Sequence, residues 1–316
     1  MRLSIFASDG LRAPAAIAIL LAALATYFCV LEVAMRVVVP SLSAEQQRQE
    51  KDYRSALALQ PRTPAGAATV LVVGNSLLLH GVVRSQLRAS LAPQYAVELY
   101  PIQGTDFLDW YFGLRRLFAR GSHPSTVIVC MNVRGLISDS TDGEGFARVM
   151  MQMQDLPQVR RLAGLDMMAT SDYFFANVSA WIGGRVYFRN GVLEKWMPHA
   201  SMLVAHFSAV DPTLLTASPT VIARALEHLR LIRALCRSRG ITFIMLIPPS
   251  RNRNDPAPTI AAYAAREDIP VLIPYGPGEM PAENFSDGLH LNDSGAALFT
   301  SRLDTLLPIR LGAVPF

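Results

Sequence analysis

The chain has 316 residues, of which 51% are apolar and 17% are charged. This length allows one ample hydrophobic core, with about two average domains as the ceiling. The net charge of +4 comes from basic residues scattered along the chain, and only Lys51 and Lys195 are lysines, which argues against nucleic-acid binding. With 3 cysteines in this length, the chain is not a small module stapled by disulfides.

The first element expected along the chain is a membrane-spanning helix. Residues 13–31 carry no charge over 19 positions, and as a helix they would measure about 28 Å, close to the hydrocarbon thickness of a bilayer. Basic residues favour the cytoplasmic side of a membrane, so Arg2 and Arg12 place residues 1–12 inside. We therefore expect a single-pass anchor over residues 13–39 in the inner (cytoplasmic) membrane of a bacterium, with the rest of the chain in the periplasm.

A cleaved signal peptide is the alternative interpretation of this segment. Ser41-Leu42-Ser43 could serve as a small-residue cleavage site, but the apolar region would be long for a signal peptide. Residues 40–66 are polar and punctuated by proline, so we expect them to form a stalk that leads off the membrane.

From residue 67 to residue 316, short apolar strands alternate with amphipathic helices. The alternation predicts a three-layer α/β sandwich with a mostly parallel, flavodoxin-like sheet. The expected strands are Thr69–Val73, Ala96–Tyr100, Ser125–Cys130, Ile241–Ile247 and Pro270–Ile273. The expected helices are Leu77–Leu91, Asp106–Arg120, Val221–Arg239, Pro258–Glu267 and Ala296–Leu307. Active sites of such sheets lie at the carboxyl ends of the strands.

The alternation lapses over residues 133–219, where helical pieces rich in Met and Arg replace it. We interpret this range as an insertion that folds over the upper edge of the sheet. Ordinary helical packing is the simpler role for it. A surface that faces a partner or a membrane is the alternative, suggested by Trp181, Tyr187, Phe188 and Trp196 interleaved with Arg185, Arg189 and Lys195.

Two short motifs supply the groups of a nucleophilic acyl-transfer site. Ser76 lies in Gly74-Asn75-Ser76-Leu77, directly after the first expected strand, and the other motif is Ser286-Asp287-Gly288-Leu289-His290. A serine is a weak nucleophile until a base takes its proton. His290 is the expected base and Asp287 would hold its tautomer. Taken singly, the aspartate is more often a helix cap and the histidine a surface residue, so their coincidence with the serine carries the interpretation.

A nucleotide-binding loop is the competing interpretation of a turn after a strand. Neither the Gly-x-Gly-x-x-Gly spacing nor a Walker-type spacing is present, which disfavours it. The two motifs instead resemble the first and last conserved blocks of the SGNH (GDSL-type) hydrolases. The resemblance covers roughly residues 69–307 and leaves residues 133–219 unmatched.

The resemblance also implies an oxyanion hole. Its donors would be the N–H of Ser76, the N–H of Gly104 after the second expected strand, and the side-chain amide of Asn132 after the third. Three positions depart from the family pattern: Asn75 replaces the common Asp, and Cys130 and Val133 replace the Gly and the second Asp of Gly-x-Asn-Asp.

Three further residues are expected as pocket residues rather than catalytic ones. Asn75 can cap the turn that carries the nucleophile, and His80 lacks a neighbouring carboxylate that would orient it as a base. Asp106 could line the pocket, although an acid that complements a helix dipole is the simpler role for it and for Asp109. The remaining histidines show no metal-ligand spacing, so we expect neither a metal nor another cofactor.

These observations predict a membrane-anchored, extracytoplasmic serine esterase or O-acyltransferase. The resemblance implies its substrates, an O-acyl group, with acetyl expected, on a cell-envelope or exported carbohydrate, and a multi-spanning membrane acyltransferase as partner. The triad residues leave open whether water or a sugar hydroxyl accepts the acyl group. Two alternatives remain: a non-catalytic SGNH-fold scaffold of an envelope polysaccharide complex, with the insertion as its docking surface, and a lipid-ester hydrolase at the bilayer surface.

Overall fold

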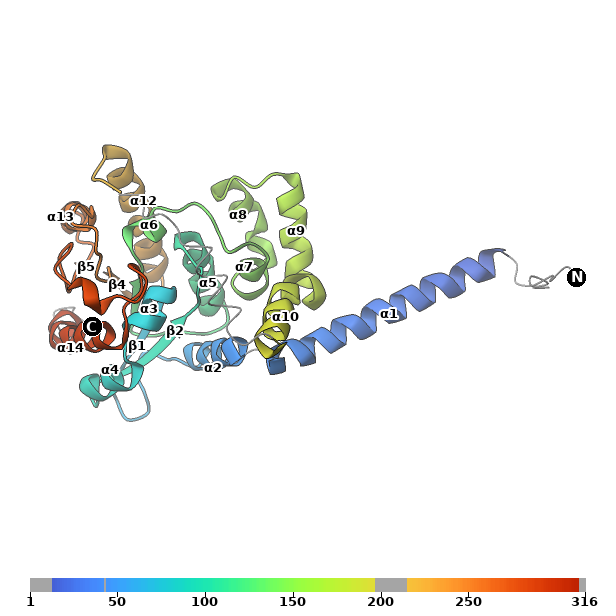
Figure 1. Cartoon of the computed structure of the whole chain (residues 1–316), viewed down its shortest axis with the longest axis horizontal. Helices are drawn as coiled ribbons and strands as arrows, with labels where there is room; N and C mark the ends of the chain where they lie inside the picture. The colour runs from blue at the N-terminus through green and yellow to red at the C-terminus, as the bar shows by residue number, and fades with distance from the viewer. Residues whose placement is uncertain (1–12, 43, 197–214, 313–316) are drawn as a thin grey trace, which may run out of the picture.

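The structure, a computed structural model, describes residues 13–42, 44–196 and 215–312. Helix α1 (Ala13–Leu42) extends far from a body in which helices surround a sheet (Figure 1). Its residues Pro14–Val39 form a stretch long and apolar enough to span a membrane or to act as a signal sequence. The expected cytoplasmic segment 1–12 and residues 197–214 of the insertion lie outside the described residues.

A five-stranded parallel sheet, in the order β2-β1-β3-β4-β5, forms the centre of the described body. Its strands are β1 (Ala68–Gly74), β2 (Tyr95–Pro101), β3 (Thr126–Cys130), β4 (Thr242–Leu246) and β5 (Val271–Leu272). Gly74, the last residue of β1, is paired with Pro101 on one side and with Cys130 on the other. The carboxyl ends of three neighbouring strands therefore meet at one edge, where sheets of this kind bind ligands.

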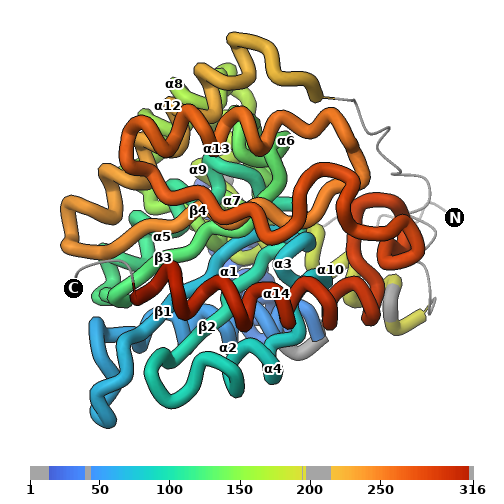
Figure 2. Tube along the Cα trace, turned by 90° about the vertical axis from the view of Figure 1, so that its left-hand side faces the viewer, coloured from blue at the N-terminus to red at the C-terminus, as the bar shows by residue number. Residues whose placement is uncertain are grey.

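Helices cover both faces of this sheet, which confirms the predicted three-layer α/β class. On one face lie α5 (Phe107–Ala119), α12 (Pro219–Arg237) and α13 (Ala257–Ala265), and on the other lie α3 (Ser76–Gly81), α4 (Arg84–Leu91) and α14 (Asp293–Gly312). In Figure 2 α14 crosses in front of β1 and β2, while α12 and α13 lie above β4. Because both faces are covered, all seven residues of β1 are buried.

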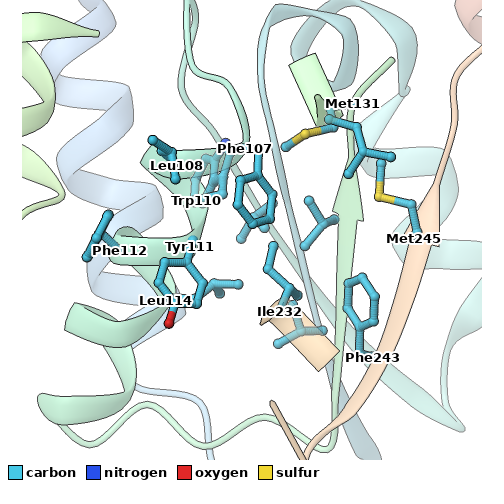
Figure 3. Close-up of a cluster of buried hydrophobic side chains, with 14 of the residues drawn as sticks. Phe107, Leu108, Trp110, Tyr111, Phe112, Leu114, Met131, Ile232, Phe243 and Met245 are labelled. Atoms are coloured by element: carbon cyan, nitrogen blue, oxygen red, sulfur yellow. The ribbon is translucent and has the colours of Figure 1, made fainter. Parts of the chain in front are cut away.

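Aromatic side chains of α5 fill the core on one face. Phe107, Trp110 and Phe112 have no exposed surface, and Figure 3 shows the α5 cluster beside Met245 and Phe243 of β4. Burial of a large side chain contributes about 1.5–3 kcal/mol. This core holds α5 firmly, and with it the loop that joins β2 to α5.

The expected helix Leu77–Leu91 is two helices, α3 and α4, separated by Val82 and Val83. Both valines have extended backbone angles. The N–H of Val83 donates to Oγ1 of Thr300 at 2.9 Å, so a contact from α14 replaces a helical hydrogen bond. β-branched residues lose little by leaving a helix, which favours a break at the two valines. The break is not evident from the local sequence, because the threonine that stabilises it lies 217 residues away.

The range 40–66, expected as a stalk, contains helix α2 (Ala44–Leu57), which packs against β2 and belongs to the folded body. Its Asp52 is 3% exposed and forms ion pairs with Arg84 of α4 and with Arg48 of α2 itself. The polar composition of this range suggested a solvated linker. The range instead contains a packed helix, because some of its charged side chains form ion pairs with the buried Asp52.

The insertion contains α6 (Val133–Leu136), α7 (Gly143–Val149), the 3₁₀ helix η1 (Met153–Asp155), α8 (Leu156–Leu162), α9 (Met167–Val178) and α10 (Ala180–Trp196). Figure 1 shows α7, α9 and α10 beside the sheet, between α5 and α1. Met35 and Val39 of α1 are buried against Ala180 of α10. The insertion therefore connects the long N-terminal helix to the body, because its apolar side chains pack against α1.

Candidate active site

Ser76 is positioned by the end of β1. Asn75 follows the strand as the N-cap of α3, and its Oδ1 accepts a hydrogen bond from the N–H of Leu77 at 3.0 Å. The expected capping role of Asn75 is thus present, and it makes Ser76 the first residue of α3. The Ser76 side chain is partly exposed, on a turn that is otherwise buried.

Gly74, the last residue of β1, is required by the packing of the sheet. A Cβ atom at this position would lie 2.2 Å from the carbonyl oxygen of Cys130. The close approach of β3 therefore excludes any side chain here.

Asp287 and His290 lie in a short loop between the 3₁₀ helix η2 (Ala282–Asn284) and α14. Oδ1 of Asp287 accepts the N–H groups of Leu289 at 3.0 Å and His290 at 2.7 Å. Oδ2 of Asp287 lies 2.6 Å from Nδ1 of His290. The carboxylate thus stabilises its own turn with one oxygen and orients the imidazole with the other; it is not a helix cap, because α14 begins six residues later, at Asp293.

The structure brings Ser76 and His290 into direct contact. Oγ of Ser76 lies 2.8 Å from Nε2 of His290. An ionised carboxylate can only accept hydrogen bonds, so Nδ1 of His290 carries the proton that faces Asp287. The lone pair of Nε2 is then directed at the serine hydroxyl, which is the tautomer that a general base needs.

The aspartate is held in its ionised form. Partial burial raises its pKa, but hydrogen bonds from the ring and backbone of His290 and from the N–H of Leu289 outweigh this effect and lower the pKa of Asp287 overall. A negative charge at this position stabilises the imidazolium that would form when His290 accepts a proton.

The ring of His80 lies next to the imidazole of His290. The centroids of the two rings are 5.3 Å apart, in an edge-to-face arrangement. Burial and the proximity of His290 lower the pKa of His80, which favours a neutral ring there. The expectation of a pocket residue fits this position.

Gly104 and Asn132 follow the two strands that flank β1. Gly104 lies three residues past the end of β2 and has φ of +74°, a conformation that favours glycine. Asn132 is the N-cap of α6, and its Oδ1 accepts the N–H of Gly135 at 2.9 Å. With its oxygen occupied, the Nδ2 amino group is the end of Asn132 that is free to donate.

The two departures from the family pattern around Asn132 are core positions. Cys130 has no exposed surface, and its carbonyl group faces Gly74. Val133 is 1% exposed and belongs to the core on the α5 face. Both side chains are therefore part of the packed core on either side of the sheet.

An aspartate cluster beside Gly104 adds a residue that the sequence did not indicate, Asp142. Its Oδ1 lies 3.6 Å from the place that a Cβ of Gly104 would occupy. Its N–H donates to Oδ1 of the buried Asp109 at 2.9 Å, and Oδ2 of Asp109 accepts the N–H of Asp106 at 2.7 Å. The Asp-Gly pair at 142–143 indicates a turn, but only the fold shows which loop it meets.

Desolvation controls the ionisation of this cluster. Burial raises the pKa of Asp109 to about 8, although two backbone N–H groups oppose the shift. Desolvation, and then the charge of Asp106, raise the pKa of Asp142 to about 6. Burial also raises the pKa of Asp106, whose Oδ1 lies 3.0 Å from the Cβ position of Gly135, next to Asn132. Asp106 is therefore near the expected pocket, and Asp109 mainly fixes the surrounding loops.

Comparison with solved structures finds an acetyl xylan esterase, Est2A, from the rumen bacterium Butyrivibrio proteoclasticus, with a TM-score of 0.37 and 9% sequence identity. The match covers 79% of this chain and 65% of the esterase, so it spans somewhat less than two thirds of that protein's length. No protein-family model matches the chain. No curated protein matches it.

Proposed function

We propose that the protein is a serine acyl-esterase or O-acyltransferase of the SGNH type that works through an acyl-serine intermediate. The observation that carries this proposal is the hydrogen-bonded chain from Ser76 through His290 to Asp287, with contacts of 2.8 Å and 2.6 Å. Nucleophile, base and orienting carboxylate within such reach are the arrangement that activates a hydroxyl for acyl transfer.

The reaction follows from the positions of these groups. Oγ of Ser76 attacks the ester carbonyl carbon while Nε2 of His290 takes the hydroxyl proton. The tetrahedral intermediate collapses to the acyl-serine, and His290 returns its proton to the departing alkoxide. An incoming hydroxyl group then repeats the sequence in reverse, and the acyl group leaves with it.

The oxyanion that forms in each half-reaction needs fixed donors. We assign this role to the N–H of Ser76, the N–H of Gly104 and the Nδ2 amide of Asn132, which follow three adjacent strands. The hydrogen bond from the Gly135 N–H to Oδ1 of Asn132 supports the assignment, because it fixes the orientation of the side-chain amide and leaves Nδ2 to donate. One such donor typically contributes about 3 kcal/mol to transition-state stabilisation.

The cellular setting of the proposal rests on α1 and on the resemblance between motifs. We propose that α1 stays in the inner membrane as an anchor, with the catalytic body in the periplasm. The substrate class is an O-acylated carbohydrate of the envelope or an exported polysaccharide, with acetyl as the acyl group. A multi-spanning membrane acyltransferase is the proposed partner that would deliver the acyl group.

A fluorophosphonate probe tests the proposal directly. The full-length chain should become labelled at Ser76, and the label should be lost in Ser76→Ala and strongly reduced in His290→Ala. An unlabelled but folded wild-type protein would overturn the enzymatic proposal and favour the scaffold. A labelled protein is then incubated with acetylated glycan and, separately, with phospholipid. Release of acetate from the glycan supports the glycan enzyme, and release of fatty acid from the phospholipid supports a lipid-ester hydrolase.

The choice between water and a sugar as acceptor needs a separate measurement. An acetyl-enzyme generated from an activated ester should be challenged with water alone and with added oligosaccharide. Faster disappearance of the acetyl-enzyme together with acetylated sugar indicates transfer. Release of acetate at a rate that the sugar leaves unchanged indicates hydrolysis.

A further inference from the structure

Two adjoining cavities lie where α1 meets the body, away from the Ser76 site. The first has a volume of about 590 Å³ and is lined by residues of α1, α2, β2, α5, α7 and α9. The second, of about 530 Å³, is lined by α1 and by the junction of α9 with α10. Arg36 and Val178 line both, and neither includes a residue of the proposed triad or oxyanion hole.

The first cavity is strongly basic. Its lining contains four arginines, Arg36, Arg54, Arg116 and Arg148, and one carboxylate, Glu50. Two of the arginines have carboxylate partners, because Arg36 pairs with Glu32 and Arg54 with Glu50. Two positive charges of the lining are therefore left without a carboxylate partner, which suits an anion.

Arg116 and Arg148 supply the unneutralised charge. In the part of the chain that the structure describes, no carboxylate lies within ion-pair distance of either guanidinium. Nη1 of Arg116 donates to the carbonyl oxygens of Arg148 at 2.9 Å and Met151 at 3.2 Å. Its Nε is buried and has no hydrogen-bond partner among the described residues. Buried charge of this kind is costly unless something pairs with it.

The second cavity is apolar except at its edge. Phe28, Leu31 and Val33 of α1 face Val178, Trp181 and Ile182 across it. Such an apolar lining suits a hydrocarbon chain rather than a polar ligand. Arg36 and Val178 line both cavities, so the two are neighbours that a single amphiphilic ligand could occupy together.

The position of both cavities along α1 identifies their surroundings. Glu32 is the first charged residue after the uncharged stretch 13–31, and Arg36 follows it by one turn. In a spanning helix these residues lie at the level of lipid headgroups, where arginine side chains are favoured. The apolar cavity is level with the last turns of the stretch, where acyl chains begin.

Hydrogen bonds from Glu32 of α1 hold the start of α10 next to both cavities. Oε1 of Glu32 accepts the N–H of Ala180 at 2.6 Å, and Oε2 accepts the N–H of Trp181 at 3.2 Å and the hydroxyl of Ser179 at 3.0 Å. The start of α10 is therefore capped by a side chain of α1. With Glu32 engaged there, its charge only partly neutralises Arg36.

We propose that the two cavities together bind one anionic phospholipid, with its phosphate among Arg36, Arg116 and Arg148 and an acyl chain in the second cavity beside Trp181. The proposal rests on α1 being kept as a membrane span. It adds a site that is separate from catalysis: a bound anionic lipid pairs the free arginines and fastens α1 to the α9–α10 junction. The lipid would thereby fix the orientation of the catalytic body on the membrane surface.

Native mass spectrometry of the full-length chain in detergent tests this site, with phosphatidylglycerol and phosphatidylcholine as probes. The intact mass first shows whether residues 1–42 are retained. The wild-type chain should bind phosphatidylglycerol in preference to phosphatidylcholine, and Arg148→Gln should weaken phosphatidylglycerol binding about tenfold, as expected for the loss of one charge-assisted contact. Arg148→Lys should restore much of the binding, because it keeps the charge.

The matched control is Arg266→Gln. This arginine is the C-cap of α13, lies over the ring of Tyr263 and lines neither cavity. The variant should bind phosphatidylglycerol like the wild type, and fluorophosphonate labelling of all variants shows that the catalytic body is folded. Equal binding of the two lipids, or unchanged binding in Arg148→Gln, would overturn the proposal. Displacement of the lipid by inorganic phosphate alone would assign the basic cavity to free phosphate and overturn the lipid assignment. Loss of labelling with lipid binding intact would count against the proposed function only.

Discussion

Oγ of Ser76 lies 2.8 Å from Nε2 of His290, although 214 positions separate the two residues in the chain. One partner is held by the end of a fully buried strand, and the other by a loop that an isolated β-bridge between Phe285 and Leu291 closes. The contact therefore depends on the packing of α14 against α3 and α4, which brings the last part of the chain to the first strand.

Substitutions within the triad should not act independently. Ser76→Ala should abolish covalent turnover of an activated acetyl ester. We expect His290→Ala to reduce the rate on the order of 10³-fold or more, because the serine then lacks its base. The double variant should be no slower than Ser76→Ala, as measured by single-turnover kinetics. Losses that simply multiply would mean that the two residues do not work as one unit.

Asn132 allows its two proposed roles to be separated. Asn132→Ala removes both the Nδ2 donor and the Oδ1 cap of α6, so we expect about a hundredfold loss of rate and about 1 kcal/mol loss of stability. Asn132→Asp keeps an oxygen for the Gly135 N–H but has no amide donor. It should unfold at nearly the wild-type temperature and still be as slow as the alanine variant. Wild-type rates in Asn132→Asp would remove the residue from the oxyanion hole.

The strand pattern allowed the parallel sheet to be predicted from sequence, and the order of the motifs led to the expectation that Ser76 and His290 meet at the carboxyl ends of its strands, where the two side chains are in contact. These features depend on local apolar periodicity and on the rule that ligands bind at carboxyl ends. The break at Val82-Val83 and the position of Asp142 beside Gly104 depend on contacts between distant segments, with Thr300 and with Asp109. Local pattern carries no information about such partners.

Gly74→Ala tests the close approach of β3 to β1. The added methyl group would lie 2.2 Å from the carbonyl oxygen of Cys130, and a backbone atom in the middle of a sheet cannot move away cheaply. We expect the strands to separate locally, with a loss of about 1–3 kcal/mol or more and reduced fluorophosphonate labelling of Ser76. Gly312→Ala, where the added methyl meets open space, is the control. A Gly74→Ala protein with wild-type stability and labelling would contradict the packing described for this edge.

Asp52 tests whether α2 belongs to the folded body. Its carboxylate is almost fully buried and pairs with Arg84 and Arg48, so Asp52→Ala leaves Arg84 without its carboxylate partner, whereas Arg48 keeps its pair with Glu45. Breaking a buried pair in this way typically costs about 3–5 kcal/mol. Glu50→Ala, which removes the exposed pair with Arg54 on the same helix, should cost less than about 1 kcal/mol. Similar unfolding temperatures for the two variants would indicate that α2 does not contribute to the folded body and acts as a linker.

The stability of the chain should fall as pH rises between about pH 4 and pH 8, and Asp109 should account for much of the slope. Its pKa rises from 3.8 to about 8 through burial, so in this window the folded state holds a proton that the unfolded state has lost. One such group changes the unfolding free energy by up to about 1.4 kcal/mol per pH unit, in the direction of lower stability at higher pH. Thermal unfolding of the full-length chain in detergent across this range measures the slope.

In Asp109→Asn the group cannot titrate, so the dependence of stability on pH should flatten. The amide suits the N–H groups of Asp106 and Asp142 less well, so this variant should also be less stable than the wild type at low pH. Asp172→Asn, at an exposed position on α9, should keep the wild-type slope, and an Asp109→Asn slope equal to that of the control would show that this carboxyl group stays ionised in the folded protein.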